Sequence, residues 1–208
     1  MAVLPVVIAA LSLVVAGATF FLTQLRAARI SVHVGPGIEV GYDANGNADV
    51  VLPTTFINES NRTGIVRSAA ITLGRRDDSQ PQFFIMWDDF MVYDEKGDGW
   101  AISETAHALP IPNKASVHKD IWFSWFGDQS VNLQFRAGEY ELTFYWWEPS
   151  STCPRKRVHP LVISEDDFKT LERHRKRHDQ ELTPIPIDRT FAPNMVLSSQ
   201  NVRDLLGP

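Results

Sequence analysis

Two kinds of segment are spaced in ways that could bind a metal ion. His174 and His178 are four residues apart, which would place both on one face of a helix, but the three residues between them are Arg or Lys and their charge opposes a cation. The acidic turns at 43–49 and 94–99 alternate oxygen donors as calcium loops do. In the first, Thr54 occupies the twelfth position, where such loops carry glutamate. Hairpin turns explain both acidic segments, so we expect no metal site.

Signatures of catalysis are also missing from the sequence. It contains no G-x-S-x-G elbow, no phosphate-binding loop and no G-x-G-x-x-G motif. The adjacent pairs at 77–78 and 88–89 are carboxylates that a strand would point to opposite faces. Cys153 is the single cysteine, which excludes an intrachain disulfide, and we interpret it as a surface thiol. We therefore expect no catalytic residue and no cofactor.

Aromatic residues are the strongest candidates for binding. In the segments 121–126 and 142–147, strand alternation places one set of large side chains on the core face and a second aromatic set on the opposite face. That second face needs a cover, and exposed aromatic patches typically mark interaction sites. We predict a partner-binding surface, for another protein or for self-association, made of Trp122, Phe126, Tyr145 and Trp147. Coverage by the C-terminal arm is the alternative.

The first 25 residues carry no charged side chain. A helix over residues 2–23 would be about 33 Å long, enough to cross a hydrocarbon core of about 30 Å. A cleaved signal peptide is the alternative, because residues 16–18 read Ala-Gly-Ala, but no Lys or Arg precedes the apolar run. We predict a transmembrane anchor over residues 1–25 that contacts the lipid bilayer through residues 2–23.

Basic residues suggest which way the chain faces. Arg26 and Arg29 follow the apolar run, and only the α-amino group precedes it. The positive-inside rule then favours a single-pass protein of the cell membrane with its domain on the cytoplasmic side. A periplasmic or extracellular domain is the alternative.

A second basic cluster ends a predicted helix at 164–179. Ser164 would cap this helix, and acidic residues at 165–167 suit its positive end. We predict that this cluster, together with Arg26 and Arg29, contacts anionic headgroups, at about 1 kcal/mol per residue near the surface. Its members are Arg173, Arg175, Lys176 and Arg177. A helix end that is only solvated by water is the alternative. A net charge of −5 argues against a nucleic-acid partner.

Residues 26–163 hold eight to ten short apolar segments separated by turn signals, of which 43–47 (Asp-Ala-Asn-Gly-Asn) is the clearest. None of these segments has sustained helical periodicity. Strands without intervening helices predict an antiparallel β-sandwich. Residues 180–208 contain several prolines and predict an irregular tail.

Residues 135–143 (FRAGEYELT) resemble the F-x-x-G-x-Y-x-L phrase of immunoglobulin-like and fibronectin-type sandwiches. In those domains a turn glycine, here Gly138, precedes a strand whose tyrosine, here Tyr140, packs at a corner. With the anchor and residues 24–29, the chain resembles uncharacterised bacterial single-span membrane proteins that carry one such domain. The resemblance implies a mainly β protein: an antiparallel immunoglobulin-like β-sandwich, preceded by one transmembrane helix and followed by a short C-terminal helix and an irregular tail.

This resemblance implies no activity. We therefore expect a membrane-anchored, non-catalytic interaction or assembly module. One alternative is an extracytoplasmic sandwich that binds carbohydrate by stacking sugars on the exposed aromatic side chains. A further alternative is an enzyme whose site residues are brought together only by the fold.

Overall fold

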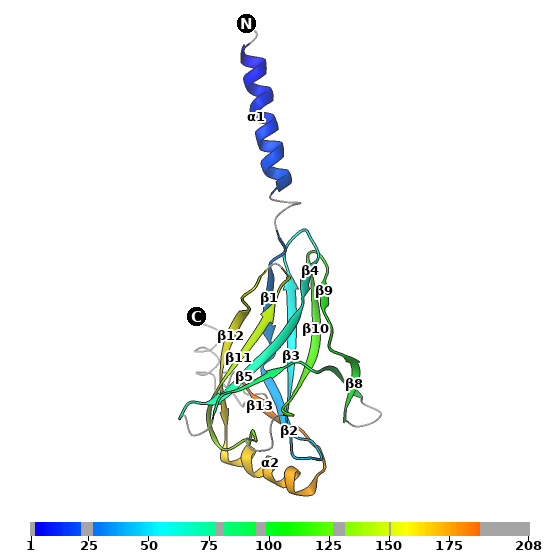
Figure 1. Cartoon of the computed structure of the whole chain (residues 1–208), viewed down its shortest axis with the longest axis vertical. Helices are drawn as coiled ribbons and strands as arrows, with labels where there is room; N and C mark the ends of the chain where they lie inside the picture. The colour runs from blue at the N-terminus through cyan, green and yellow to red at the C-terminus, as the bar shows by residue number, and fades with distance from the viewer. Residues whose placement is uncertain are drawn as a thin grey trace, which may run out of the picture.

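The chain is mainly β, with antiparallel sheets and two helices (Figure 1). The computed structural model describes residues 3–21, 27–77, 81–94, 99–126, 132–149 and 151–187. In this part of the chain, the prediction of a mainly β fold with antiparallel strands and a short C-terminal helix is confirmed.

Most strands belong to a large sheet and a small sheet. The large sheet consists of β1 (Ile30–Val34), β2 (Gly37–Tyr42), β3 (Ala48–Asn58), β7 (Asp89–Asp94), β8 (Gly99–Thr105), β10 (Ala115–Ser124) and β13 (Thr183–Pro186). The small sheet consists of β5 (Ser68–Arg75), β6 (Phe83–Met86), β11 (Gly138–Trp147) and β12 (Arg155–Ile163). A separate ribbon pairs β4 (Gly64–Val66) with β9 (Leu109–Ile111).

The long strand β3 organises the large sheet. One of its edges pairs with β10 from Asp49 to Asn58, and on its other edge β2 pairs with the first half and β1 with the second half. Beyond β10 the large sheet continues with β7 and then β8, and beyond β2 it continues with β13. In the small sheet the order is β12-β11-β5-β6.

The two sheets face each other across an aromatic core. Phe56 of β3 and Phe123 of β10 lie with their ring centroids 6.3 and 6.4 Å from that of Phe144 on β11. All three side chains are fully buried. The alternation of apolar residues in these strands places one side chain in two on the core face, as the sequence predicted.

A tyrosine corner closes one end of β11, where the sequence phrase placed it. The hydroxyl of Tyr140 accepts a hydrogen bond from the backbone N–H of Arg136 (2.8 Å) and donates one to its carbonyl (3.0 Å). Gly138 makes this corner possible, because its φ is +144° and a Cβ there would lie 2.8 Å from Nη2 of Arg75.

The C-terminal helix α2 (Glu165–Arg177) begins as the sequence predicts. The Ser164 side chain accepts a hydrogen bond from the backbone of Asp167, whose carboxylate bonds back to the backbone of Ser164. Leu171 is the helix residue buried against the core. The helix packs at the end of the sandwich formed by β2 and β13.

The tail after this helix differs from the prediction of an irregular segment throughout. Residues 183–186 form β13, which pairs with β2, so the β-sandwich extends past residue 163. Pro184 and Pro186 are tolerated because β13 lies at the edge of the sheet, where a missing N–H leaves no ladder bond unmade. The side chains of β13 alternate between buried and exposed positions, with Thr183 and Ile185 buried.

The prediction of a transmembrane helix is not met by the structure. Helix α1 (Val3–Phe20) has 18 residues and a length of about 27 Å, whereas the predicted span was about 33 Å. Among the described residues, no helix is both long and apolar enough to cross a membrane. The large apolar side chains of α1 are nevertheless exposed, from 47% at Val7 to 75% at Leu13.

Candidate ligand-binding pocket on the large sheet

Strand alternation builds a pocket on the outer face of the large sheet. Ile121 and Phe123 of β10 are fully buried in the core, so Trp122 between them points outward. Trp122 lies opposite Val51 of β3 and opposite Asp89 of β7. The pocket therefore has its floor on three adjacent strands.

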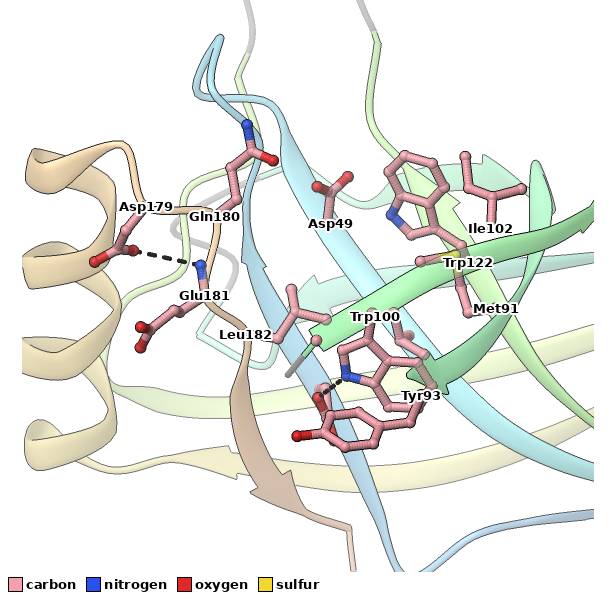
Figure 2. A pocket seen from close by; sticks show the side chains of 13 residues that line it. Asp49, Met91, Tyr93, Trp100, Ile102, Trp122, Asp179, Gln180, Glu181 and Leu182 are labelled. Carbon is pink, nitrogen blue, oxygen red and sulfur yellow. Dashed lines mark hydrogen bonds between the residues drawn. The ribbon is translucent and has the colours of Figure 1, made fainter. Parts of the chain in front are cut away.

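Two other segments form its walls (Figure 2). The β7–β8 hairpin supplies one wall, and residues 179–182, between α2 and β13, supply the other. The cavity has a volume of about 540 Å³. Its lining combines aromatic side chains (Tyr93, Trp100, Trp122), aliphatic ones and Met (Val51, Met91, Ile102, Leu182) and carboxylates (Glu39, Asp49, Asp179, Glu181). None of the described residues that line it is basic.

The edge hairpin is held over β2 by a specific contact. The indole Nε1 of Trp100 donates a hydrogen bond of 2.6 Å to Oε2 of Glu39. The ring of Tyr93 packs edge-on against Trp100, with centroids 5.7 Å apart and an interplanar angle of 80°. These contacts fix two aromatic rings beside a carboxylate at the mouth of the pocket.

A buried carboxyl group lies in the lining. Burial raises the pKa of Asp49 from 3.8 to about 6, and the carboxylates of Asp43 and Asp88 add to the rise. The Ser124 hydroxyl and the Trp122 indole oppose this rise in pKa. The side chain of Asp49 is 6% exposed, and its Oδ1 has no hydrogen-bond partner among the described residues. A buried carboxyl group with a raised pKa and one unpartnered oxygen is typical of a functional site.

One group of side chains beside the pocket has the composition of a metal site. Nδ1 of His174 lies 3.0 Å from Oδ1 of Asp179 and 3.4 Å from Oε2 of Glu181. The imidazole already pairs with both carboxylates, and Glu181 is exposed. His178 does not join His174, because it caps the helix in a left-handed conformation. We interpret this group as a local side-chain contact that ends α2.

The four predicted aromatic contact residues do not form one surface. Trp122 lines the pocket, and Phe126 follows the end of β10 with 63% of its surface exposed. Tyr145 and Trp147 lie on the outer face of the small sheet, with ring centroids 6.4 Å apart. Because β10 and β11 belong to different sheets, their outward faces lie on opposite sides of the sandwich.

Sequence reasoning missed most of the pocket. Residues 91 and 93 of β7 and 100 and 102 of β8 alternate large apolar and aromatic side chains on one face of the hairpin. This pattern was readable in the sequence and could have marked the wall. The buried state of Asp49 could not be read, because it depends on the pairing of β3 with β2 and β10.

The predicted membrane-surface residues are also divided. Arg29 directly precedes β1, and Arg26 lies outside the described residues. The basic end of α2 lies at the opposite end of the sandwich (Figure 1). Arg175 stacks over the ring of Tyr42, 5.1 Å from its centroid, and pairs with Glu172. The structure thus does not bring Arg173, Arg175, Lys176 and Arg177 to the end of the sandwich that carries Arg29.

Comparison with known proteins adds little. No protein-family model matches the chain, and no curated protein matches it. Among solved structures, the chain is similar to the X-ray structure of Northeast Structural Genomics Consortium target SoR45, at 9% sequence identity and a TM-score of 0.34. The alignment covers 67% of this chain and 87% of that chain. A likeness this weak says nothing about function.

Proposed function

We propose that the chain is a membrane-attached, non-catalytic recognition module with an immunoglobulin-like sandwich. Its pocket on the large sheet binds a cationic group of a partner protein, such as a lysine or arginine side chain. The observation that carries this proposal is the lining itself, which combines three aromatic rings with four carboxylates and contains no described basic residue.

Both halves of this lining attract a cation. The faces of Trp and Tyr rings carry negative charge density, and a desolvated cation on such a face gains about 2 kcal/mol. Glu39 and Asp49 add negative charge in surroundings less polar than water, where it acts more strongly. The unpartnered Oδ1 of Asp49 would gain its missing hydrogen bond from an ammonium or guanidinium group.

Two further observations support the remaining parts of the proposal. The corner made by Tyr140 and Arg136 is a feature of immunoglobulin-like sandwiches. The exposed Leu, Val, Ile and Phe side chains of α1 form a surface that water solvates poorly. Attachment of the N-terminal segment to a lipid bilayer would cover it. Flotation of the full chain with liposomes in a density gradient tests this attachment, and recovery of the chain in the bottom fraction, away from the liposomes, would refute it.

Binding of a short lysine peptide, measured by calorimetry on the full chain in neutral detergent, tests the pocket. Trp122→Ala and Trp100→Ala should each weaken binding by about tenfold, because each removes one cation-binding ring. Trp147→Ala is the matched control, since it removes a half-buried tryptophan from the outer face of the other sheet. Equal losses in all three variants, or no binding of the peptide, would contradict the proposal.

A carbohydrate is the second candidate ligand, because the same rings could stack on a sugar and the carboxylates could accept hydrogen bonds from its hydroxyl groups. The two candidates differ in their response to pH. Cation binding should strengthen as pH rises through about 6, where Asp49 becomes charged. Binding of a neutral oligosaccharide should change little over that range. A cellulose-type oligosaccharide that binds while the lysine peptide does not would decide for the carbohydrate.

A further inference from the structure

A second cavity lies at the seam between the two sheets, where β1 of the large sheet meets β12 of the small sheet. Its volume is about 430 Å³. The lining residues come from residues 29–32, from residues 155–157 of β12, and from Trp146 of β11. None of them lines the pocket on the large sheet.

The polar groups around this cavity are those that bind an anion. Four of the lining residues are cations: Arg29, Arg155, Lys156 and Arg157. Ser31 adds a hydroxyl group. Trp146 is 6% exposed, and its indole Nε1 is buried with no hydrogen-bond partner in the described part of the chain.

Two of these four cations already contact other groups of the protein. Nε of Arg155 lies 2.9 Å from Oε1 of Glu148, so one cation is paired. Nη1 of Arg157 donates a hydrogen bond of 2.6 Å to the carbonyl of Val32, which ties the two sheets together across the seam. The side chains of Arg29 and Lys156 are exposed and make no hydrogen bond or ion pair with other side chains in the described part of the chain. The cavity therefore keeps an excess of positive charge.

The position of the cavity indicates which anion it meets. Residues 29–32 are the first part of the sandwich to follow the apolar N-terminal segment. Seven residues lie between Phe21 and Arg29, and the eight steps from one Cα to the other span at most about 28 Å when fully extended. The end of the apolar segment is therefore tethered close to the cavity, whereas the basic end of α2 lies at the far end of the sandwich.

We propose that this seam cavity binds the phosphate of an anionic phospholipid headgroup. Arg29, directly before β1, and Lys156 of β12 border the cavity from its two sides and would contact the phosphate. This inference rests on the membrane attachment proposed above and is independent of the ligand of the pocket on the large sheet. It differs from the sequence-based prediction, because residues 155–157 take the place of the basic helix.

Lipid binding to the full chain in neutral detergent, measured by native mass spectrometry, tests the proposal. The probes are phosphatidylglycerol, phosphatidylcholine and inorganic phosphate. We expect phosphatidylglycerol to bind more tightly than both others. The double variant Arg29→Gln/Lys156→Gln should lose about 25-fold of that affinity, since each cation near an anionic lipid contributes about fivefold. Both side chains are exposed, so the fold should be retained.

The matched control is Arg173→Gln/Lys176→Gln, which removes the same charge from exposed positions on α2. Its affinity for phosphatidylglycerol should equal that of the unaltered chain. Equal binding of the two lipids, or equal losses in both double variants, would overturn the proposal. Binding of inorganic phosphate as tight as that of phosphatidylglycerol would overturn the lipid assignment. Liposome flotation separately reports whether the chain is attached to membranes, so the two failures can be told apart.

Discussion

Asp49→Asn is expected to stabilise the chain at neutral pH and to leave its stability nearly unchanged at about pH 4. Burial raises the pKa of Asp49 from 3.8 to about 6, so the folded chain binds this proton more tightly than the unfolded chain does. Between these two values the folded state holds the extra proton, and stability falls as pH rises. A difference of about 2 units, at about 1.4 kcal/mol per unit, gives a loss of about 3 kcal/mol.

The asparagine variant has the same shape and no charge to bury, so this loss should be absent from it. The free energy of unfolding is measured by urea denaturation of the full chain in neutral detergent, at intervals from pH 4 to pH 8. The difference between variant and unaltered chain should grow from about zero to about 3 kcal/mol. Glu59→Gln provides the control, because this carboxylate is exposed and its removal should give a difference that stays flat with pH.

A flat difference for Asp49→Asn as well would refute the reasoning, because it would mean that burial does not disfavour the charged form of this carboxyl group. The same variant also tests the pocket. Above pH 7 it should weaken binding of the lysine peptide, because a carboxylate is lost. At pH 5 its affinity should match that of the unaltered chain, in which Asp49 is already largely protonated.

Three further predictions concern the frame that holds these sites. Ser164→Ala should lower the free energy of unfolding by about 1 kcal/mol through loss of the helix cap, and an unchanged urea midpoint would contradict this. Tyr140→Phe should cost about 1–3 kcal/mol in the same assay, because both backbone groups of Arg136 lose their partner. Gly138→Ala should lower the free energy of unfolding by about 1–3 kcal/mol, because of the positive φ and the close approach of Arg75. An unchanged midpoint of thermal unfolding would argue against that strain.

Local patterns in the sequence predicted the local structure well. Alternation in 121–126 and 142–147 correctly placed Trp122, Tyr145 and Trp147 on the outward faces of their strands. The phrase around Gly138 predicted the tyrosine corner, and Ser164 predicted the start of the helix. Each of these features depends on residues within one turn or one strand.

Features that depend on distant pairing could not be predicted in this way. The sequence does not say that β10 joins the large sheet and β11 the small one, and this assignment separates Trp122 from Trp147. The strand at residues 183–186 could not be predicted either. Its two prolines favour an irregular segment, and the strand forms because these residues pair with the edge of β2. Asp49 is buried because three strands meet around it, and the seam cavity joins residues more than 110 positions apart.

The two proposed sites lie at opposite ends of β3, and their charges have opposite signs. Ile30 and Val32, at the basic seam, pair with Asn58 and Phe56, which are seven to nine residues along β3 from Asp49. At about 3.3 Å per residue, this separation is about 23–30 Å, roughly three Debye lengths at physiological ionic strength. An anionic bilayer would attract the basic seam. At the acidic pocket, dissolved salt would screen the electrostatic potential of that bilayer. A module attached in this way would present the pocket away from the membrane, where a cationic partner would not have to compete with the lipid surface.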